Sequence, residues 1–186
     1  MIPVRVHGVT ADPTTNQFLM LLIDDVERRL LPIVIGQWEA QSIAWNMQGI
    51  KMQRPLTHDL FKSFLNSINI KITRVVIDNL KDNTFYATIK LNFNGNKVEI
   101  DSRPSDAVAI ALRMNAPIFV AEEVFEKAAV KIDSDYAHEL NELNESTEIV
   151  QLNKELKEAV EKENYEKAAE IRDKIKKLEN KDKSEN

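Results

Sequence analysis

Short apolar runs separated by turn residues fill about the first 130 residues, and their spacing predicts both strands and helices. Alternating or continuously apolar runs predict strands at residues 2–9, 18–23, 30–35, 70–77, 84–93, 97–100 and 118–120. Apolar residues three or four apart predict helices at residues 37–48, 58–68, 105–114 and 122–129. Strands and helices do not alternate throughout, which argues against a doubly wound parallel sheet. We predict an α+β domain with a mixed, hairpin-rich β-sheet packed with helices.

Turn and capping residues support several of these boundaries. Asp82-Asn83 and Asn94-Gly95 separate extended runs and predict two hairpins. Thr57 is the expected N-cap of the second helix, because its hydroxyl can accept from free amides of the first turn. Trp38 and Trp45 are seven residues apart on one helix, so they share a face that we expect to pack in the core or against another subunit.

The pattern changes near residues 130–135. After Asp133 there is no glycine or proline. Apolar residues at helical spacing predict two helices, with Asn164 capping the second: Ile149, Leu152, Leu156 and Val160 in the first, and Tyr165, Ala168, Ile171, Ile175 and Leu178 in the second. We expect a main domain at 1–132, a linker or helix at 133–147, an antiparallel helical hairpin at 148–181 and a disordered tail at 182–186. So small a hairpin needs the main domain, a second copy or a partner to cover its apolar stripe.

Composition narrows the classes of function. The chain has 25 Lys and Arg against 30 Asp and Glu, and neither half has the basic excess typical of proteins that bind nucleic acid mainly by phosphate neutralisation. It has no cysteine, which excludes disulfides, thiolate zinc sites and a cysteine nucleophile. No apolar run approaches the roughly 18 residues of a membrane-spanning helix. We expect a cytoplasmic protein without a membrane segment.

Acidic residues and a histidine occupy the first turn of three predicted helices: Glu39, His58, Asp59 and Asp106. Each carboxylate is explained by its favourable interaction with the helix dipole, worth about 0.3–1 kcal/mol. The helix dipole does not explain why the four residues occur together with two arginines. Arg54-Pro55 and Arg103-Pro104 directly precede two of the same helices. If the three helix starts converge, they form a polar pocket with carboxylates, one imidazole and two guanidinium groups.

Three segments, at residues 31–40, 54–60 and 99–113, resemble the bifunctional nuclease domain family, which implies DNase and RNase activity. A fourth segment, at residues 156–175, is similar to the UVR motif of bacterial excision-repair proteins, which implies a helical hairpin for protein–protein contact. That resemblance assigns partner binding to Tyr165, Ala168, Ala169, Ile171, Arg172 and Ile175.

The polar set suits phosphodiester hydrolysis. We expect Glu39, His58 and Asp59 to be catalytic, because carboxylates and imidazole can transfer protons near neutral pH. Arg54 and Arg103 are candidates for bidentate phosphate binding. Asp101 and Asp106 are the best candidates to hold Mg²⁺ or Mn²⁺, which would polarise the phosphate, and Glu39 and Asp59 are the next candidates.

Two functions stay open at this point. The first is a metal-dependent nuclease for DNA or RNA with a partner-recruiting hairpin. The second is a non-enzymatic binding or regulatory module, which the near-neutral charge favours. In either case we expect a homo-oligomer, most simply a dimer, because the apolar run at 18–23 needs cover on both faces.

Overall fold

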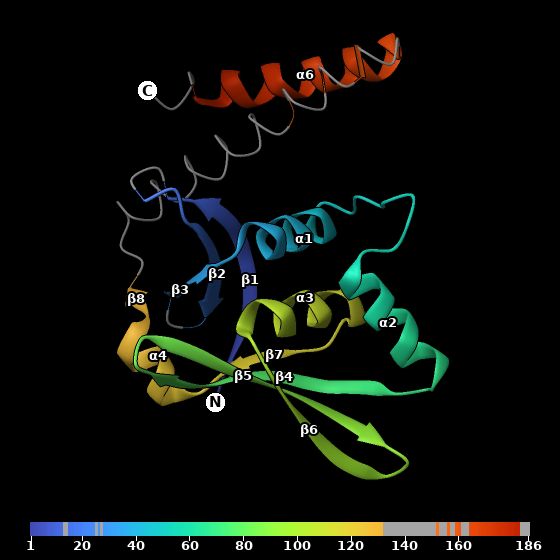
Figure 1. Cartoon of the computed structure of the whole chain (residues 1–186). Coiled ribbons are helices and arrows are strands. Elements are labelled where there is room, and N and C mark those ends of the chain that lie inside the picture. Colours follow the sequence, from blue (N-terminus) through green and yellow to red (C-terminus); the bar gives the residue numbers. More distant parts are fainter. Residues whose placement is uncertain are drawn as a thin grey trace. The chain divides into compact units, whose positions relative to one another are not determined.

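The chain folds into two compact units, Met1–Ile132 and Asp133–Asn186, each of which is considered by itself (Figure 1). The computed structural model describes residues 1–12, 15–24, 26, 28–131, 152, 156, 159–160 and 164–182, with side chains to residue 175. Within these residues, no helix is both long and apolar enough to cross a membrane.

One mixed sheet forms the framework of the first unit. Its strands are β1 (Ile2–Ala11), β2 (Phe18–Asp24), β3 (Arg29–Ile35), β4 (Lys71–Lys81), β5 (Thr84–Phe93), β6 (Asn96–Ser102), β7 (Ile118–Val120) and β8 (Val130–Lys131). In the described part of the chain they follow the order β6-β5-β4-β7-β1-β2-β3-β8. Only β4 and β7 are parallel, and every other neighbouring pair is antiparallel. Two meanders, β1-β2-β3 and β4-β5-β6, are therefore joined through β7.

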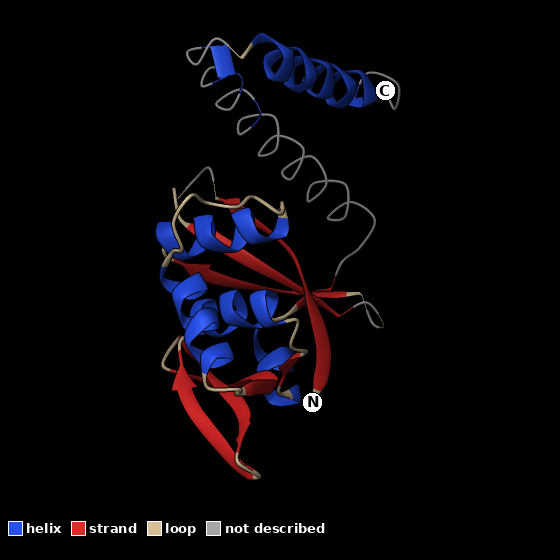
Figure 2. Ribbon diagram, turned by 90° about the vertical axis from the view of Figure 1, so that its right-hand side faces the viewer, coloured by secondary structure: helices blue, strands red, loops and turns tan. Residues whose placement is uncertain are grey.

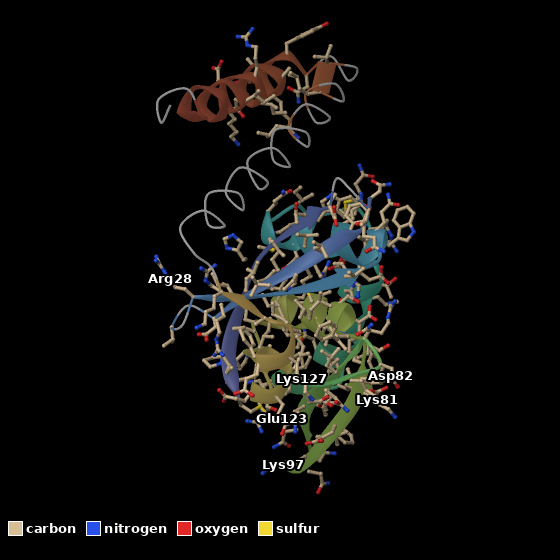
Figure 3. All side chains as sticks on the ribbon, turned by 90° about the vertical axis from the view of Figure 1, so that its left-hand side faces the viewer. Arg28, Lys81, Asp82, Lys97, Glu123 and Lys127 are labelled. Carbon is tan, nitrogen blue, oxygen red and sulfur yellow. The ribbon has the colours of Figure 1, made fainter. Side chains whose placement is uncertain are left out.

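Two-residue turns close the second meander. The turn between β4 and β5 consists of Asp82 (Figure 3) and Asn83, with φ of 49° and 58°. Asn94 and Gly95, with φ of 50° and 84°, connect β5 to β6. Positive φ at both central residues is the type I′ geometry that matches the twist of a hairpin, and Asn, Asp and Gly tolerate it best. Both predicted hairpins are confirmed.

Four helices complete the first unit: α1 (Gln37–Met47), α2 (Thr57–Ser67), α3 (Pro104–Met114) and α4 (Glu122–Ala128). α1 contacts β1 and β2, while α3 contacts β4 and β5. Figures 1 and 2 show α1, α2 and α3 on the same side of the sheet. α3 is the most deeply buried helix, since Ala107 to Ala111 are all part of the main core. Its alanines leave room for α1 and α2 to pack closely against it.

The α+β prediction is confirmed, with corrections at particular residues. β8 was not predicted, because two residues carry no readable period. Thr57 is the first residue of α2 rather than its N-cap, and the Asp59 carboxylate accepts from the amide of Leu56 at 3.0 Å instead. Trp38 does not pack in the core, since 75% of it is exposed.

In the second unit, α6 spans Tyr165–Asp182. Asn164 caps it as predicted, because its Oδ1 accepts from the amide of Lys167 at 3.2 Å. An apolar cluster joins α6 to the preceding segment: Ala159, Ala168, Ile171 and Ile175 are buried and pack with Leu152 and Leu156. The predicted linker at 133–147, much of the first hairpin helix and the tail beyond Asp182 lie outside the described residues. The antiparallel hairpin therefore stays a prediction.

This cluster yields a test of the second unit. Ile171→Ala should cost about 2 kcal/mol or more and melt the helices of this unit, because Ile171 is buried in a cluster too small to compensate. The exposed Tyr165→Ala, its matched control, should leave the helices intact. Far-ultraviolet circular dichroism during thermal melting measures both effects. Equal helicity and equal melting in the two variants would contradict the cluster.

Candidate functional site

Three helix N-termini meet at one polar network, because α1 and α2 both pack on α3. Glu39, Asp59 and Asp106 each occupy the third position of their helix, in α1, α2 and α3 respectively. Carboxylates are favoured there by the helix dipole. Both this explanation and the predicted convergence of the helix starts therefore apply.

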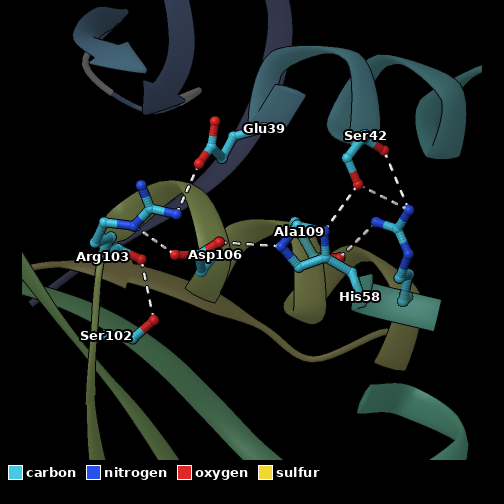
Figure 4. A network of polar contacts seen from close by, with 8 residues as sticks. Glu39, Ser42, His58, Ser102, Arg103, Asp106 and Ala109 are labelled. Carbon is cyan, nitrogen blue, oxygen red and sulfur yellow. Dashed lines mark hydrogen bonds and ion pairs between the residues drawn. The ribbon is translucent and has the colours of Figure 1, made fainter. Parts of the chain in front are cut away.

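Arg103 links the two acids nearest the surface (Figure 4). Its Nε donates to Oδ2 of Asp106 and its Nη2 donates to Oε1 of Glu39, both at 2.7 Å. Of the Arg103 side chain 66% is exposed, against 17% of Glu39 and 28% of Asp106. The guanidinium thus forms the solvent-facing end of the network, with one carboxylate from each of two helices behind it.

His58 continues the network inward. Its Nε2 lies 3.1 Å from Oδ1 of Asp106, and its Nδ1 lies 2.9 Å from the Ser42 hydroxyl (Figure 4). Only 12% of the side chain is exposed. Both ring nitrogens are therefore engaged with neighbours from other helices.

A buried arginine lies at the inner end. Arg113, with 4% of its side chain exposed, donates through Nε to Oδ1 of Asp59 at 2.6 Å. Its Nη1 donates to the carbonyl of Ala109 at 3.0 Å. Its Nη2 donates to the carbonyl and the hydroxyl of Ser42, at 3.3 and 3.1 Å. One guanidinium thereby joins α1, α2 and α3.

The donors and acceptors of this network fit one tautomer of a neutral His58 ring. Because Arg113 can only donate, the Ser42 hydroxyl accepts from it and keeps its own hydrogen for another acceptor. The lone pair on Nδ1 of a neutral His58 ring is that acceptor. The ring hydrogen is then on Nε2 and is donated to Asp106, which can only accept when ionised.

The same contacts set the charge state of the carboxylates. Burial alone would raise the pKa of Asp106, but hydrogen bonds from Arg103 and His58 outweigh it, and the pKa lies below the ordinary value. Burial alone would also raise the pKa of Asp59. Hydrogen bonds from Arg113 and from the Leu56 amide outweigh this effect, so that the pKa of Asp59 is lowered as well. Bonds to Asp106 and Glu39 raise the pKa of Arg103. Asp59, Asp106 and Arg103 are therefore all charged at neutral pH.

Two predicted site residues are not brought into this network. Arg54 is exposed in the loop between α1 and α2 and forms no hydrogen bond or ion pair with any described residue. Asp101 pairs with Thr88 in the sheet, whereas its neighbour Ile100 pairs with the buried Ile89. Because side chains alternate along a strand, Asp101 is on the face of the sheet opposite to α3 and Asp106.

The placed residues do not fit a divalent metal ion. Both oxygens of Asp106 already accept hydrogen bonds, and the Arg103 guanidinium occupies the position between Asp106 and Glu39 that a cation would need. Among the described residues, no three side chains of His, Cys, Asp or Glu are grouped so that they could hold a metal. Mg²⁺ or Mn²⁺ stays a prediction.

Sequence reasoning missed Ser42 and Arg113. Both had a readable signal. Arg113 follows Asp106 by seven residues and so lies on the same face of α3, two turns later. Ser42 follows Glu39 by three residues on α1. The sequence did not show that α3 is buried on the side that carries Arg113. Because of this burial, the charge of Arg113 depends on Ser42 and Asp59.

The lowered pKa of Asp59 predicts a pH-dependent stability. Asp59→Asn should lower the free energy of unfolding by about 1–2 kcal/mol at pH 7, because the buried Arg113 keeps only a neutral partner. The native pKa lies below the ordinary 3.8, so this stabilisation is complete above about pH 5 and is lost as the pH falls through the native value. Urea unfolding from pH 7 to about pH 2 should therefore show the two proteins converging in acid. Asp101→Asn, at an exposed aspartate outside the network, is the control. A constant difference at all pH values would contradict the ion pair.

Comparison with known proteins agrees with the division of the chain. Residues 20–133 match the model of the bifunctional nuclease domain, and residues 146–181 match that of the UvrB/uvrC motif. The first match covers more than half of the 186 residues.

Several known proteins are similar in sequence to this chain, at different levels of identity. The uncharacterized protein Rv1829 of Mycobacterium tuberculosis is 40% identical over 132 residues, which are 71% of this chain and 79% of the relative. Bifunctional nuclease 2 of Arabidopsis thaliana is 25% identical over 177 residues, covering 84% of this chain and 54% of the plant protein. Bifunctional nuclease 1 of Oryza sativa subsp. indica is 24% identical over 124 residues, or 65% of this chain and 38% of that protein. The extent of the domain match and the identity to the mycobacterial relative show that the chain belongs to the bifunctional nuclease domain family.

Proposed function

We propose that this protein hydrolyses phosphodiester bonds of DNA or RNA at the meeting point of α1, α2 and α3, and that its C-terminal hairpin recruits a protein partner. Membership of the family and the names of the plant relatives support the reaction. One observation carries the choice of place: Arg103 is exposed, yet two carboxylates hold it in a fixed orientation.

Arg103 is the phosphate-binding group of this proposal. Its Nε and Nη2 are engaged with Asp106 and Glu39, while Nη1 donates to no described residue. A guanidinium held from behind presents its remaining N–H groups to solvent at low entropic cost, and charge-assisted bonds to phosphate oxygens are strong. The rate of catalysis then depends on how well these bonds stabilise the negative charge that develops on the phosphate in the transition state.

Glu39 is the proposed general base. Its Oε1 accepts from Arg103, whereas Oε2 accepts from no described residue. A Cβ built on Gly36 would clash with Oε2, so the glycine allows this carboxylate to fold back over the start of α1. A carboxylate with a free oxygen beside a bound phosphate can take the proton of an attacking water. As the oxygen of this water bonds to phosphorus, one P–O ester bond breaks, and the leaving oxygen takes a proton from solvent.

His58 and Asp59, the other predicted catalytic residues, are assigned positioning roles. The two ring nitrogens of His58 and the two oxygens of Asp59 all have partners. Every nitrogen or oxygen that could take a proton from water is therefore already engaged in a hydrogen bond within the protein. In this proposal His58 orients Asp106, and Asp106 in turn orients Arg103.

The local charge favours the second candidate, a non-enzymatic binding module. Glu39, Asp59 and Asp106 supply three negative charges against two positive charges from Arg103 and Arg113. Counted as side chains alone, this excess opposes an approaching phosphate. Substituting Glu39 separates the two functions. Loss of the proposed base should lower cleavage, whereas loss of its negative charge should not weaken the binding of an anion.

The cleavage assay uses fluorescent single-stranded DNA and RNA with Mg²⁺, with Mn²⁺ and with EDTA. Glu39→Gln should lower cleavage about 100-fold or more, while oligonucleotide binding stays equal or becomes tighter through loss of one negative charge. Arg103→Gln should lower cleavage about 100-fold or more and weaken binding as well. Asp101→Asn, on the opposite face of the sheet, should retain wild-type rates.

The outcomes separate the candidates. Binding without cleavage by the wild type would favour the binding module. Equal cleavage by wild type, Glu39→Gln and Arg103→Gln would mean that the activity belongs to a contaminant or to another site. Activity that EDTA abolishes and Mg²⁺ restores would support the metal prediction.

The partner-binding residues of the hairpin divide into two groups. Ala168, Ile171 and Ile175 are buried in the cluster of their own unit. Tyr165, Ala169 and Arg172 are exposed and follow each other by four and three residues, so they share one face of α6. We therefore propose this exposed face as the contact. Tyr165→Ala, which should leave the helix intact, is the variant expected to lose partner binding.

A further inference from the structure

α2 has an apolar stripe that its own unit does not cover. Phe61 and Leu65 pack toward the sheet, where Leu65 is buried with Ile70 and Leu91. Leu60, Phe64 and Ile68 are nevertheless 62%, 55% and 41% exposed. They are four residues apart, so they form a continuous stripe along one side of the helix.

The β5–β6 hairpin extends this apolar surface. Leu91 pairs with Val98, and both pack in the same cluster as Leu65. On the same face of the hairpin, Phe93 is 44% exposed and Ile100 is 38% exposed. The exposed apolar side chains of α2 and of the hairpin therefore border one buried cluster.

The strand beside this surface has a free edge. β6 is last in the sheet order, so its outer edge pairs with no described strand. It pairs with β5 without a register shift and contains no proline, so it lacks two devices that protect edge strands from association. A free edge beside exposed apolar residues is a template for strand addition.

The sequence of β6 selects a second copy of this chain as the occupant. In an antiparallel β6–β6 pair centred on Val98, Lys97 of each copy lies opposite Glu99 of the other, on the outer face of the sheet. On the inner face, Val98 meets its own equivalent. Centring the pair on Glu99 would instead oppose two like charges. The strand is thus complementary to itself in one register.

We propose that two copies associate about a two-fold axis through Val98, so that the paired β6 strands continue the sheet and the α2 stripes are buried near the same interface. Figure 3 shows Lys97 at the outer end of the β5–β6 hairpin. A closed two-fold interface uses the same patch on both copies, as this geometry requires. The proposal is independent of the proposed activity.

The first measurement is the molar mass of the full chain by light scattering at micromolar concentration. The wild type should be a dimer. Phe64→Glu should be a monomer with an unchanged circular dichroism spectrum, because it places a charge in the buried stripe. Val34→Glu, at a 56% exposed apolar residue of β3, is the matched control and should remain a dimer.

The second measurement tests the register through introduced cysteines. The chain has none of its own, so any disulfide reports the new residues. Directly opposed residues of antiparallel strands have Cα atoms about 4.5–5.5 Å apart, within the range of a disulfide. An oxidised mixture of Lys97→Cys and Glu99→Cys should yield cross-linked dimers, whereas Lys97→Cys alone should yield few.

Three results would overturn the proposal. The wild type could be a monomer at these concentrations. The dimer could persist in Phe64→Glu, which would locate the interface elsewhere, for example in the C-terminal unit. The mixed cysteine variants could fail to cross-link although the dimer is present, which would exclude this strand pairing.

Discussion

The buried guanidinium of Arg113 is the interaction on which the arrangement of the first unit depends. A buried charge is costly unless it is paired and its donors are satisfied. Arg113 meets this condition only with groups from three helices: Ser42 of α1, Asp59 of α2 and Ala109 of α3. The planar guanidinium fixes the directions of these bonds. The relative positions of the three helices are thereby constrained by the fold itself.

Along the path from Arg113 through His58 and Asp106 to Arg103, the side chains become steadily more exposed to solvent. Side-chain exposure rises from 4% at Arg113 to 12% at His58, 28% at Asp106 and 66% at Arg103. Each member restricts the next: Arg113 sets the hydroxyl of Ser42, the hydroxyl sets the His58 ring, and the ring and Arg103 share Asp106. The two arginines therefore have different roles. Arg113 holds three helices together, whereas Arg103 keeps an Nη1 group that donates to no described residue.

Local patterns were sufficient for most of the fold and for part of the site. β5 and β7 have their predicted bounds, and the type I′ turns follow from Asp82-Asn83 and Asn94-Gly95. The parallel pairing of β4 and β7 was not predictable, since it depends on contacts between segments about 40 residues apart. The same limit applies to side chains. Trp38 belongs to a predicted apolar face, yet no described element of its own unit covers it.

Pairing in the sheet and burial of α3 decided the remaining site residues. Asp101 and Asp106 are close in sequence, but the alternation of β6 places Asp101 on the other face of the sheet. Arg113 looks like an ordinary basic residue near a helix C-terminus until the burial of α3 is known. In both cases the sequence identified a charged residue but did not show which side chains surround it in the fold.

The convergence of three helix N-termini also bears on how a site with excess carboxylates can hold a phosphate. Each N-terminus carries a partial charge of about +0.5 from its free amides. Three of them together offset the single negative charge by which Glu39, Asp59 and Asp106 exceed Arg103 and Arg113. The acids at the third helical positions are then the counter-charges that let the positive helix ends approach each other, rather than a barrier to anions. In the proposed function, a phosphate would first meet Arg103, because its guanidinium is the most exposed group of the network.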